Sequence, residues 1–175
     1  AKIHVQKEDL MGYAILGAVL LAGDQILKYW VVTHLAVGES APFLPGFMQL
    51  TRLHNYGAAW SSFSGRTVLL VVFTAVLLAV VALLLLKKVV RHWTGVTACT
   101  LILSGGIGNI IDRIVHGYVV DMFDLQLFSY PVFNLADCCV VVGAILGGIY
   151  YLFLYDKYDK KKKEPDHAHD PSDPS

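Results

Sequence analysis

The residues of this chain best suited to chemistry are carboxylates and side-chain amides in its second half. Asn134 and Asp137 stand three positions apart, and Asp121 lies in the segment before them. Two carboxylates at the same depth in a poorly hydrated site can share one proton, so that one acts as a base and the other as an acid. Asn134 and Asp137 also fit a simpler interpretation, in which the amide caps a helix and the acid lies in its first turn. The spacing alone leaves both interpretations open.

A second polar group precedes this one in the chain. Asn109, Asp112 and Arg113 lie at i, i+3 and i+4, so they share one face of a helix. Arg113 can therefore pair with Asp112 or donate to a backbone carbonyl. The acids that compete for the two roles of a reactive pair are Asp112, Asp121, Asp124 and Asp137. Spacing does not decide between them.

The histidines and cysteines do not suggest a metal site. The chain has no His-Glu-x-x-His run, and His34, His54 and His116 lie far apart in sequence. The three cysteines have no zinc-site spacing, since two are neighbours and the third is remote. We therefore expect no metal and no other cofactor.

The elements that must position these residues are membrane helices, to judge from the composition. Hydrophobic residues make up 55% of the 175-residue chain and charged residues only 16%, with a mean hydropathy of +0.55. The charges gather at the two ends and in one linker at 87–91. A water-soluble domain needs charge over its whole surface, so that class is excluded. The net charge of zero argues against a nucleic-acid partner, which would require a basic face.

Four stretches predict transmembrane helices, at about 10–32, 67–86, 93–111 and 133–155. The second is the clearest, because its twenty consecutive uncharged residues form a helix of about 30 Å, the thickness of the hydrocarbon core. Only a backbone that satisfies its own hydrogen bonds can cross lipid, which favours helices. We expect one four-helix transmembrane domain over 1–155 and a disordered cytoplasmic tail over 156–175.

Most basic residues fall on one side of these spans. That side carries Lys2, Lys7, Lys87, Lys88, Arg91, Lys157 and 160–163, whereas the other carries Lys28, Arg52, Arg66 and Arg113. The positive-inside rule then puts both termini in the cytoplasm. The polar residues gather at the extracytoplasmic face, and ionisable groups at membrane depth are usually functional. The loop at 33–66, with a strand-like segment at 47–53, completes the expected fold class: an all-α membrane protein with a small β-containing extracytoplasmic platform.

Four sequence blocks occur in order along the four spans. They are Asp24-Gln-x-x-Lys28, Asn55-Tyr-Gly-Ala-Ala59, Gly108-Asn-x-x-Asp-Arg113 with Val119-Val-Asp121, and Phe133-Asn-Leu-Ala-Asp137. Together they resemble the blocks of the bacterial lipoprotein signal peptidases (signal peptidase II) over residues 10–155. The resemblance implies an aspartic endopeptidase of the bacterial cytoplasmic membrane that removes signal peptides from diacylglyceryl-modified prolipoproteins, cleaving before the lipidated cysteine. It also implies a metal-free enzyme that globomycin-like peptides inhibit.

The resemblance assigns roles to individual residues. It selects Asp121 and Asp137 as the catalytic pair and leaves Asp124 outside the site. The substrate-binding or supporting residues that it implies are Asp24, Lys28, Asn55, Gly57, Asn109, Asp112, Arg113, Asn134 and Ala136. The chain departs from the family pattern at Trp60, where Phe is usual, and at Cys138-Cys139, where Ser is frequent. The implied partners are prolipoprotein substrates and membrane lipid, with no nucleic acid, and the expected state is a monomer.

A second class of function also fits acids gathered near one membrane face. A small proton-coupled transporter would use them, together with Arg113 and the Asn side chains, as the entrance to a solute path. The opposite halves of the spans carry almost no polar residues, which disfavours a continuous path. A membrane scaffold would not need buried acids at all. Cleavage of a lipid-modified precursor separates an enzyme from both alternatives.

Overall fold

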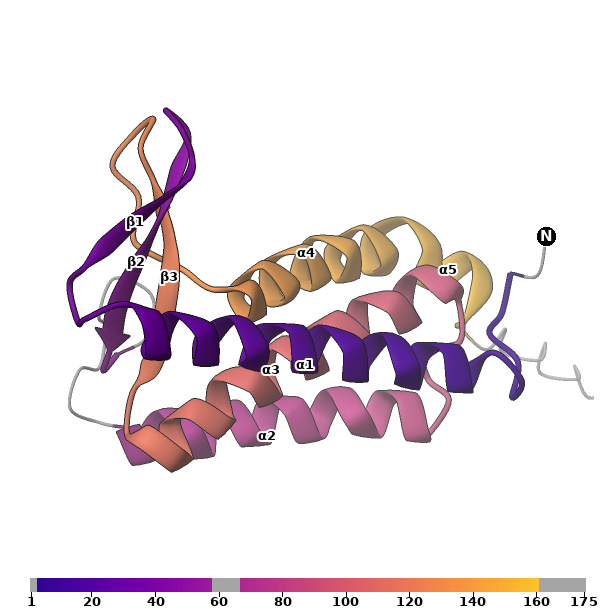
Figure 1. Ribbon diagram of the computed structural model, residues 1–175. Coiled ribbons are helices and arrows are strands. Elements are labelled where there is room, and N and C mark those ends of the chain that lie inside the picture. Colours follow the sequence, from indigo (N-terminus) through magenta and orange to yellow (C-terminus); the bar gives the residue numbers. More distant parts are fainter. Residues whose placement is uncertain (1–2, 58–66, 161–175) are drawn as a thin grey trace, which may run out of the picture.

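The computed structural model describes residues 3–57 and 67–160. Within these ranges, four helical segments are long and apolar enough to cross a membrane. They are α1 (Leu10–His34), α2 (Thr67–Leu86), α3 (Trp93–His116) and a fourth segment, Leu135–Tyr158. The fourth segment consists of α4 (Leu135–Ile149), a π-helical turn η2 (Tyr150–Leu154) and α5 (Tyr155–Tyr158). The four predicted spans are confirmed as helices, and Figure 1 shows them side by side in one bundle.

The helix α3 lies at the centre of the bundle and packs against α1, α2 and α4 (Figure 1). Its small residues allow this close approach. A Cβ atom at Gly106 would lie 2.6 Å from Leu78 of α2, and one at Gly105 would meet the carbonyl oxygen of Ala136 in α4. Helices in lipid associate through such close van der Waals packing, because apolar side chains gain little by leaving lipid for protein.

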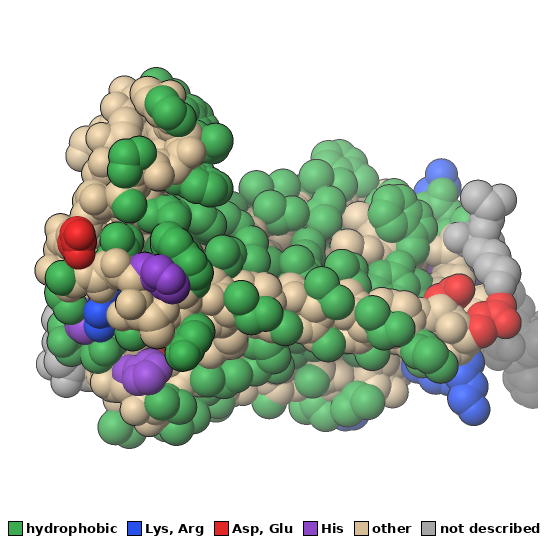
Figure 2. Space-filling model, in the orientation of Figure 1, with side chains coloured by type: hydrophobic (Ala, Val, Ile, Leu, Met, Phe, Trp, Pro, Cys, Tyr) green, Lys and Arg blue, Asp and Glu red, His purple; other side chains and the backbone are tan. Residues whose placement is uncertain are grey.

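The other spans turn mostly apolar side chains outward. Of the α2 side chains, only Leu70 and Leu78 are buried. Figure 2 shows hydrophobic side chains along the length of the helices, with Lys, Arg, Asp and Glu gathered towards the two ends of the molecule. An apolar belt between charged ends matches the requirements of a lipid bilayer.

A three-stranded antiparallel sheet stands at one end of the bundle, which we call the sheet end (Figure 1). It consists of β1 (Ser40–Leu44), β2 (Met48–Asn55) and β3 (Val119–Leu125), in the order β1-β2-β3. The strand expected at 47–53 is β2, which extends to Asn55. In the pairing of β2 with β3, Asn55 lies opposite Val119 and Leu53 opposite Asp121.

A small hydrophobic core joins this sheet to α1. Val31 and Leu35 at the end of α1 are buried together with Val120 and Met122 of β3. Burying a side chain of this size stabilises a fold by about 1.5–3 kcal/mol. The core therefore holds β3 against the bundle and determines the position of Asp121, which lies between Val120 and Met122 in the strand.

Four helix ends differ from the expected bounds: α1 ends at His34 rather than at 32, the fourth segment ends at Tyr158 rather than at 155, and the other two differences have a clear local cause. The helix α3 continues to His116, because the residue that stops it is Gly117, with φ of 80° and its N–H bonded to the Arg113 carbonyl oxygen. A left-handed glycine just after the last turn is an ordinary helix end. The fourth span begins at Leu135 rather than at 133, because Asn134 is its N-cap.

The opposite end, which we call the terminal end, brings together the described beginning and end of the chain (Figure 1). The carboxylate of Asp159 is buried there and accepts hydrogen bonds from the backbone N–H groups of Arg91 (3.0 Å) and His92 (2.9 Å) and from the Tyr150 hydroxyl (2.6 Å). His4 Nε2 lies 3.3 Å from the same carboxylate. Residues 156–160 are thus part of the folded structure and do not begin the disordered tail expected there. The rest of that expected tail, 161–175, lies outside the described residues.

Candidate active site

The predicted site residues meet at the sheet end, around a cavity of about 300 Å³. Both carboxylates of the expected pair, Asp121 from β3 and Asp137 from the first turn of α4, line this cavity. The other polar residues in its wall are Asn55, Asn109 and Arg113. Its remaining lining is apolar apart from the hydroxyl of one tyrosine, and comes from Val119, 130–133, Val140 and Val141.

Asn134 connects the two acidic residues through its side chain and its backbone N–H. Its Nδ2 donates to Asp121 Oδ1 at 2.8 Å, while its Oδ1 accepts from the backbone N–H of Asp137 at 2.8 Å. The backbone N–H of Asn134 donates in return to Asp137 Oδ2 at 3.2 Å, which completes a capping box. The capping interpretation and the site interpretation therefore describe the same geometry.

Each carboxylate is held by one further amide. Asn55 Nδ2 donates to Asp121 Oδ2 at 3.0 Å, and Asn109 Nδ2 donates to Asp137 Oδ1 at 2.8 Å. The two acids thus approach one cavity with their orientations fixed by side-chain amides. Amides can hold a carboxylate in place without adding a charge that would neutralise it.

The environment of Asp121 favours its protonated form. The residue is 1% exposed, and burial together with the nearby Asp137 carboxylate raises the pKa of Asp121 to about 7. The hydrogen bonds from Asn55 and Asn134 act in the opposite direction, since they stabilise the carboxylate. Near neutral pH, the pair can therefore retain a proton that an isolated Asp would lose.

A buried lysine organises the elements behind the cavity. Lys28 Nζ lies 2.8 Å from Asp24 Oδ2 and 3.0 Å from Asp112 Oδ2, and it donates to Asn109 Oδ1 at 3.0 Å. Because Asn109 in turn holds Asp137, the ammonium group is one residue removed from the pair of carboxylates that face the cavity. The i, i+4 spacing of Asp24 and Lys28 places both on one face of α1.

The two acids beside Lys28 fix the backbones that carry the pair. Asp24 Oδ1 accepts from the backbone N–H of Ala136 at 2.9 Å, which anchors the start of α4. Asp112 Oδ2 accepts from the backbone N–H of Val120 at 3.0 Å, which anchors β3 next to Asp121. These carboxylates support the site and do not line the cavity.

Gln25, which was not among the predicted site residues, belongs to the same network. Its Nε2 lies 3.2 Å from Asp24 Oδ2, 3.2 Å from Asp112 Oδ1 and 3.3 Å from the Gly108 carbonyl oxygen. A signal was present in the sequence, because a polar amide inside an apolar span needs partners. Gln25 also stands three residues before Lys28, on the same side of the helix.

Arg113 donates to backbone carbonyls, which is one of the two possibilities left open by its spacing. Its guanidinium donates to the Gly57 carbonyl oxygen at 2.9 Å and to the Asn109 carbonyl oxygen at 3.4 Å. The backbone N–H of Gly57 donates to Asn55 Oδ1 at 2.9 Å. Arg113 thus holds the segment that orients Asn55. Trp60, one of the two departures from the family pattern, lies outside the described residues.

The fourth acid, Asp124, is separated from the pair by the geometry of the strand. Its Oδ2 accepts from Gln49 Nε2 at 2.7 Å and from Thr51 Oγ1 at 3.0 Å, so it joins β3 to β2. Positions three apart in a strand point to opposite faces, and Asp124 does not line the cavity beside Asp121. Among the described residues, no group of three or more His, Cys, Asp or Glu side chains is arranged to hold a metal ion.

Solved structures of similar fold establish the class of protein. One described as a bacterial membrane enzyme at 2.3 Å resolution has a TM-score of 0.78 at 30% identity and covers 95% of this chain and 100% of its own. A second, at 1.9 Å resolution, has a TM-score of 0.76 at 29% identity, over 87% and 98% of the two chains. With four helices of membrane-spanning length, the chain is a multi-pass bacterial membrane protein with the fold of an enzyme.

Sequence comparisons identify the family. A family model described as signal peptidase (SPase) II matches residues 16–153. The lipoprotein signal peptidase of Enterococcus faecalis is 40% identical over 154 residues, which is 88% of this chain and 95% of the relative. That of Lactococcus lactis subsp. lactis is 38% identical over 146 residues, or 83% and 95%. The chain belongs to the signal peptidase II family and is therefore a peptidase, as the four sequence blocks indicated.

Proposed function

We propose that this peptidase is an aspartic endopeptidase that removes signal peptides from diacylglyceryl-modified prolipoproteins and cleaves just before the lipidated cysteine. The observation that carries the proposal is the arrangement of Asp121 and Asp137 on one cavity, connected through Asn134. The family and the names of its relatives support the reaction class and the substrate.

In the proposed reaction, the two carboxylates share one proton and hold a water molecule between them. Asp121 carries the proton, since burial and its neighbour raise its pKa to about 7. Asp137, at the positive end of α4, is the base. It takes a proton from the water molecule while the water oxygen attacks the scissile carbonyl carbon. Asp121 gives its proton to the carbonyl oxygen. When the C–N bond breaks, Asp137 gives its proton to the departing cysteine amine, and one hydroxyl of the tetrahedral intermediate returns a proton to Asp121, which restores the starting state of the pair.

The supporting residues serve this reaction by positioning. Asn55 and Asn109 fix the rotation of the two carboxylates, and Arg113 fixes the backbone at Gly57 beside the cavity. A substrate held against such a prepared site reacts faster, because the entropy of alignment has already been lost on folding and binding.

The place of the cavity along the bundle accounts for the proposed substrate. By the positive-inside rule the sheet end faces outward from the cytoplasm, so the cavity lies near the outer lipid headgroups. A diacylglyceryl group anchors the substrate cysteine at that surface, at about 0.8 kcal/mol per buried methylene. The scissile bond and the pair then meet at the same depth, without a deep pocket for the side chains of the signal peptide.

The test is cleavage of a lipid-modified prolipoprotein by the purified full chain, followed by the mass of the product. Asp121→Asn and Asp137→Asn should each lower kcat by at least 10³-fold, because an amide is neither a base nor a proton donor of the required strength. Asp124→Asn is the matched control, since it makes the same change outside the cavity and should retain nearly normal cleavage. Globomycin should block the reaction and chelators should leave it unchanged. Near wild-type cleavage by Asp137→Asn would refute the assignment.

A further inference from the structure

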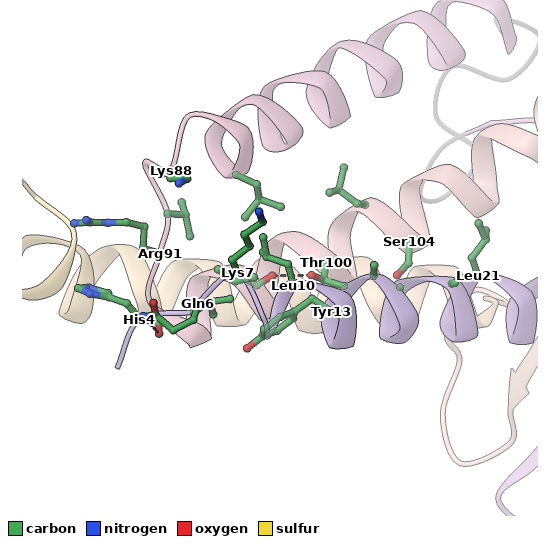
Figure 3. Close-up of a pocket in the computed structure, with 18 of the residues that line it drawn as sticks. His4, Gln6, Lys7, Leu10, Tyr13, Leu21, Lys88, Arg91, Thr100 and Ser104 are labelled. Carbon is green, nitrogen blue, oxygen red and sulfur yellow. Dashed lines mark hydrogen bonds between the residues drawn. The ribbon is translucent and has the colours of Figure 1, made fainter. Parts of the chain in front are cut away.

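A second cavity, larger than the one around the pair of carboxylates, has no part in the proposed reaction. It has a volume of about 940 Å³ and lies at the terminal end, remote from the pair of carboxylates. Figure 3 shows it between α1 and α2, with α3 behind them. The space exists because α1 and α2, both wholly described, pack against α3 and have little contact with each other.

The walls of this cavity are suited to hydrocarbon. On α1, Ala14, Gly17 and Ala18 face it, and their small side chains leave the space open. The α3 wall includes Thr100 and Ser104, whose hydroxyls donate to carbonyl oxygens of their own helix at 2.9 and 3.0 Å. The wall therefore presents few polar atoms that need a polar partner.

The length of the cavity corresponds to one leaflet of a bilayer. Its lining runs from Leu10 to Leu21 on α1 and from Val96 to Ile107 on α3. Eleven residues of helix rise about 16 Å, which is close to half of the ~30 Å hydrocarbon core. A chain that enters at the terminal end would reach about the middle of the membrane.

The mouth of the cavity is basic. Its basic lining residues are His4, Lys7, Lys88 and Arg91, and the described lining includes no carboxylate. Arg91 and His4 already share the buried Asp159 carboxylate, so Lys7 and Lys88 supply the positive charge that remains. Figure 3 shows the Lys7 side chain extending from the turn before α1 into the space below α2.

Lys88 occupies an unusual position for a lysine. It follows the end of α2 with a φ of 54°, a conformation that the residue after a helix usually reaches with Gly. The turn between α2 and α3 thus carries a lysine side chain at a position where glycine would be favoured.

From these features we propose that the cavity binds an anionic phospholipid of the leaflet at the terminal end. One acyl chain lies between α1 and α2 against α3, and the phosphate lies between the ammonium groups of Lys7 and Lys88. The pairing of a hydrocarbon groove one leaflet long with a basic mouth selects this occupant over a soluble ligand or a protein segment. The site is separate from the proposed peptidase reaction, so either proposal can fail without the other.

The test uses the purified full chain in nanodiscs of equal parts phosphatidylglycerol and phosphatidylcholine, with retained lipids counted by native mass spectrometry. The wild-type chain should retain phosphatidylglycerol in preference to phosphatidylcholine. A basic side chain near an anionic lipid is worth about fivefold in binding, so Lys7→Gln with Lys88→Gln should reduce the preference about 25-fold. Lys157→Gln with Lys160→Gln removes the same charge near the same end, outside the cavity lining, and should keep the preference.

A second pair of variants tests the groove itself. Ala18→Phe fills the cavity from an exposed position of α1, whereas Ala22→Phe adds the same ring one turn further on, at an exposed position outside the lining. Loss of the retained lipid in Ala18→Phe, but not in Ala22→Phe, supports the groove. Equal retention of both lipids by the wild-type chain, or equal losses in the cavity variants and their controls, would overturn the proposal. Cleavage of prolipoprotein in detergent should be unchanged in all four variants.

Discussion

Removing the ammonium group of Lys28 is the most informative perturbation of the network behind the cavity. Lys28 is 3% exposed, and its Nζ lies within 3.0 Å of both Asp24 and Asp112. Lys28→Met keeps most of the side-chain volume but leaves two carboxylates buried without a cation. Breaking a buried ion pair by removing one partner costs about 3–5 kcal/mol, because the remaining charge is uncompensated.

This cost should be measurable as a loss of thermal stability in detergent micelles. For a chain of this length, about 1 kcal/mol shifts Tm by about 2–4 °C, so Lys28→Met should lower Tm by about 6–20 °C. Lys157→Met is the control, since Lys157 is exposed at the terminal end and its replacement should shift Tm by no more than about 2 °C.

A compensating variant separates the loss of charge balance from the loss of packing. Adding Asp24→Asn and Asp112→Asn to Lys28→Met removes both uncompensated charges while an amide oxygen can still accept from the backbone N–H groups. We expect this triple variant to recover at least half of the lost Tm. A Lys28→Met protein with nearly normal stability, or a triple variant less stable than the single one, would refute the role given to the ion cluster.

The remaining predictions concern the titration of the pair and the packing beneath it. In the proposed reaction Asp121 must be protonated to act as the acid, and its environment raises its pKa to about 7, so kcat/KM should decline as pH rises through about 7. Asn55→Ala removes a hydrogen bond that stabilises the Asp121 carboxylate, so it should raise the pKa of Asp121 and move this decline to higher pH. A pH–rate profile of the wild-type chain and the variant measures both effects, and a shift of the decline to lower pH in the variant would contradict them. Gly105→Ala places a methyl group against the Ala136 carbonyl oxygen, so it should displace α4 and lower both Tm and activity, typically by about 1–3 kcal/mol in stability. Gly148→Ala, with open space around it, should do neither, and equal effects of the two would exclude the close contact as the cause.

The positions of the helices could be predicted from the sequence because lipid imposes length and composition on any spanning segment. The uncharged run at 67–86 coincides with α2. The strand β3 was not predicted. Its first four residues are all buried, so it lacks the alternation of polar and apolar residues that marks a strand with one solvent-exposed face. The strand β1, which pairs with β2 at the other edge of the sheet, is short, contains Pro42 and is mostly exposed, so it too gave little signal.

The residues of the candidate site could be predicted from the sequence, but which of its acids face the cavity and which hold other elements in place could not. Asp112, Asp121 and Asp124 look equivalent along the chain, and only the resemblance to a family chose among them. In the structure, the strand turns Asp124 away from Asp121, and the helix turns Asp112 towards Lys28. Asp159 was hidden for another reason: it stands in a run of Lys and Asp residues typical of a solvated tail, yet it is buried by contacts with distant residues.

The capping box at Asp137 restricts which substitutions could make the enzyme resistant to an active-site inhibitor. The carboxylate of Asp137, the base of the proposed reaction, also starts α4 by accepting from the N–H of Asn134, while the Asn134 side chain accepts from the N–H of Asp137. A substitution that evades a drug at this position would damage a helix start as well as the reaction, so single-step resistance should arise in the apolar wall of the cavity instead. Resistance should therefore emerge most slowly against compounds whose affinity depends on Asn134 and Asp137 and depends little on Val140 or Val141.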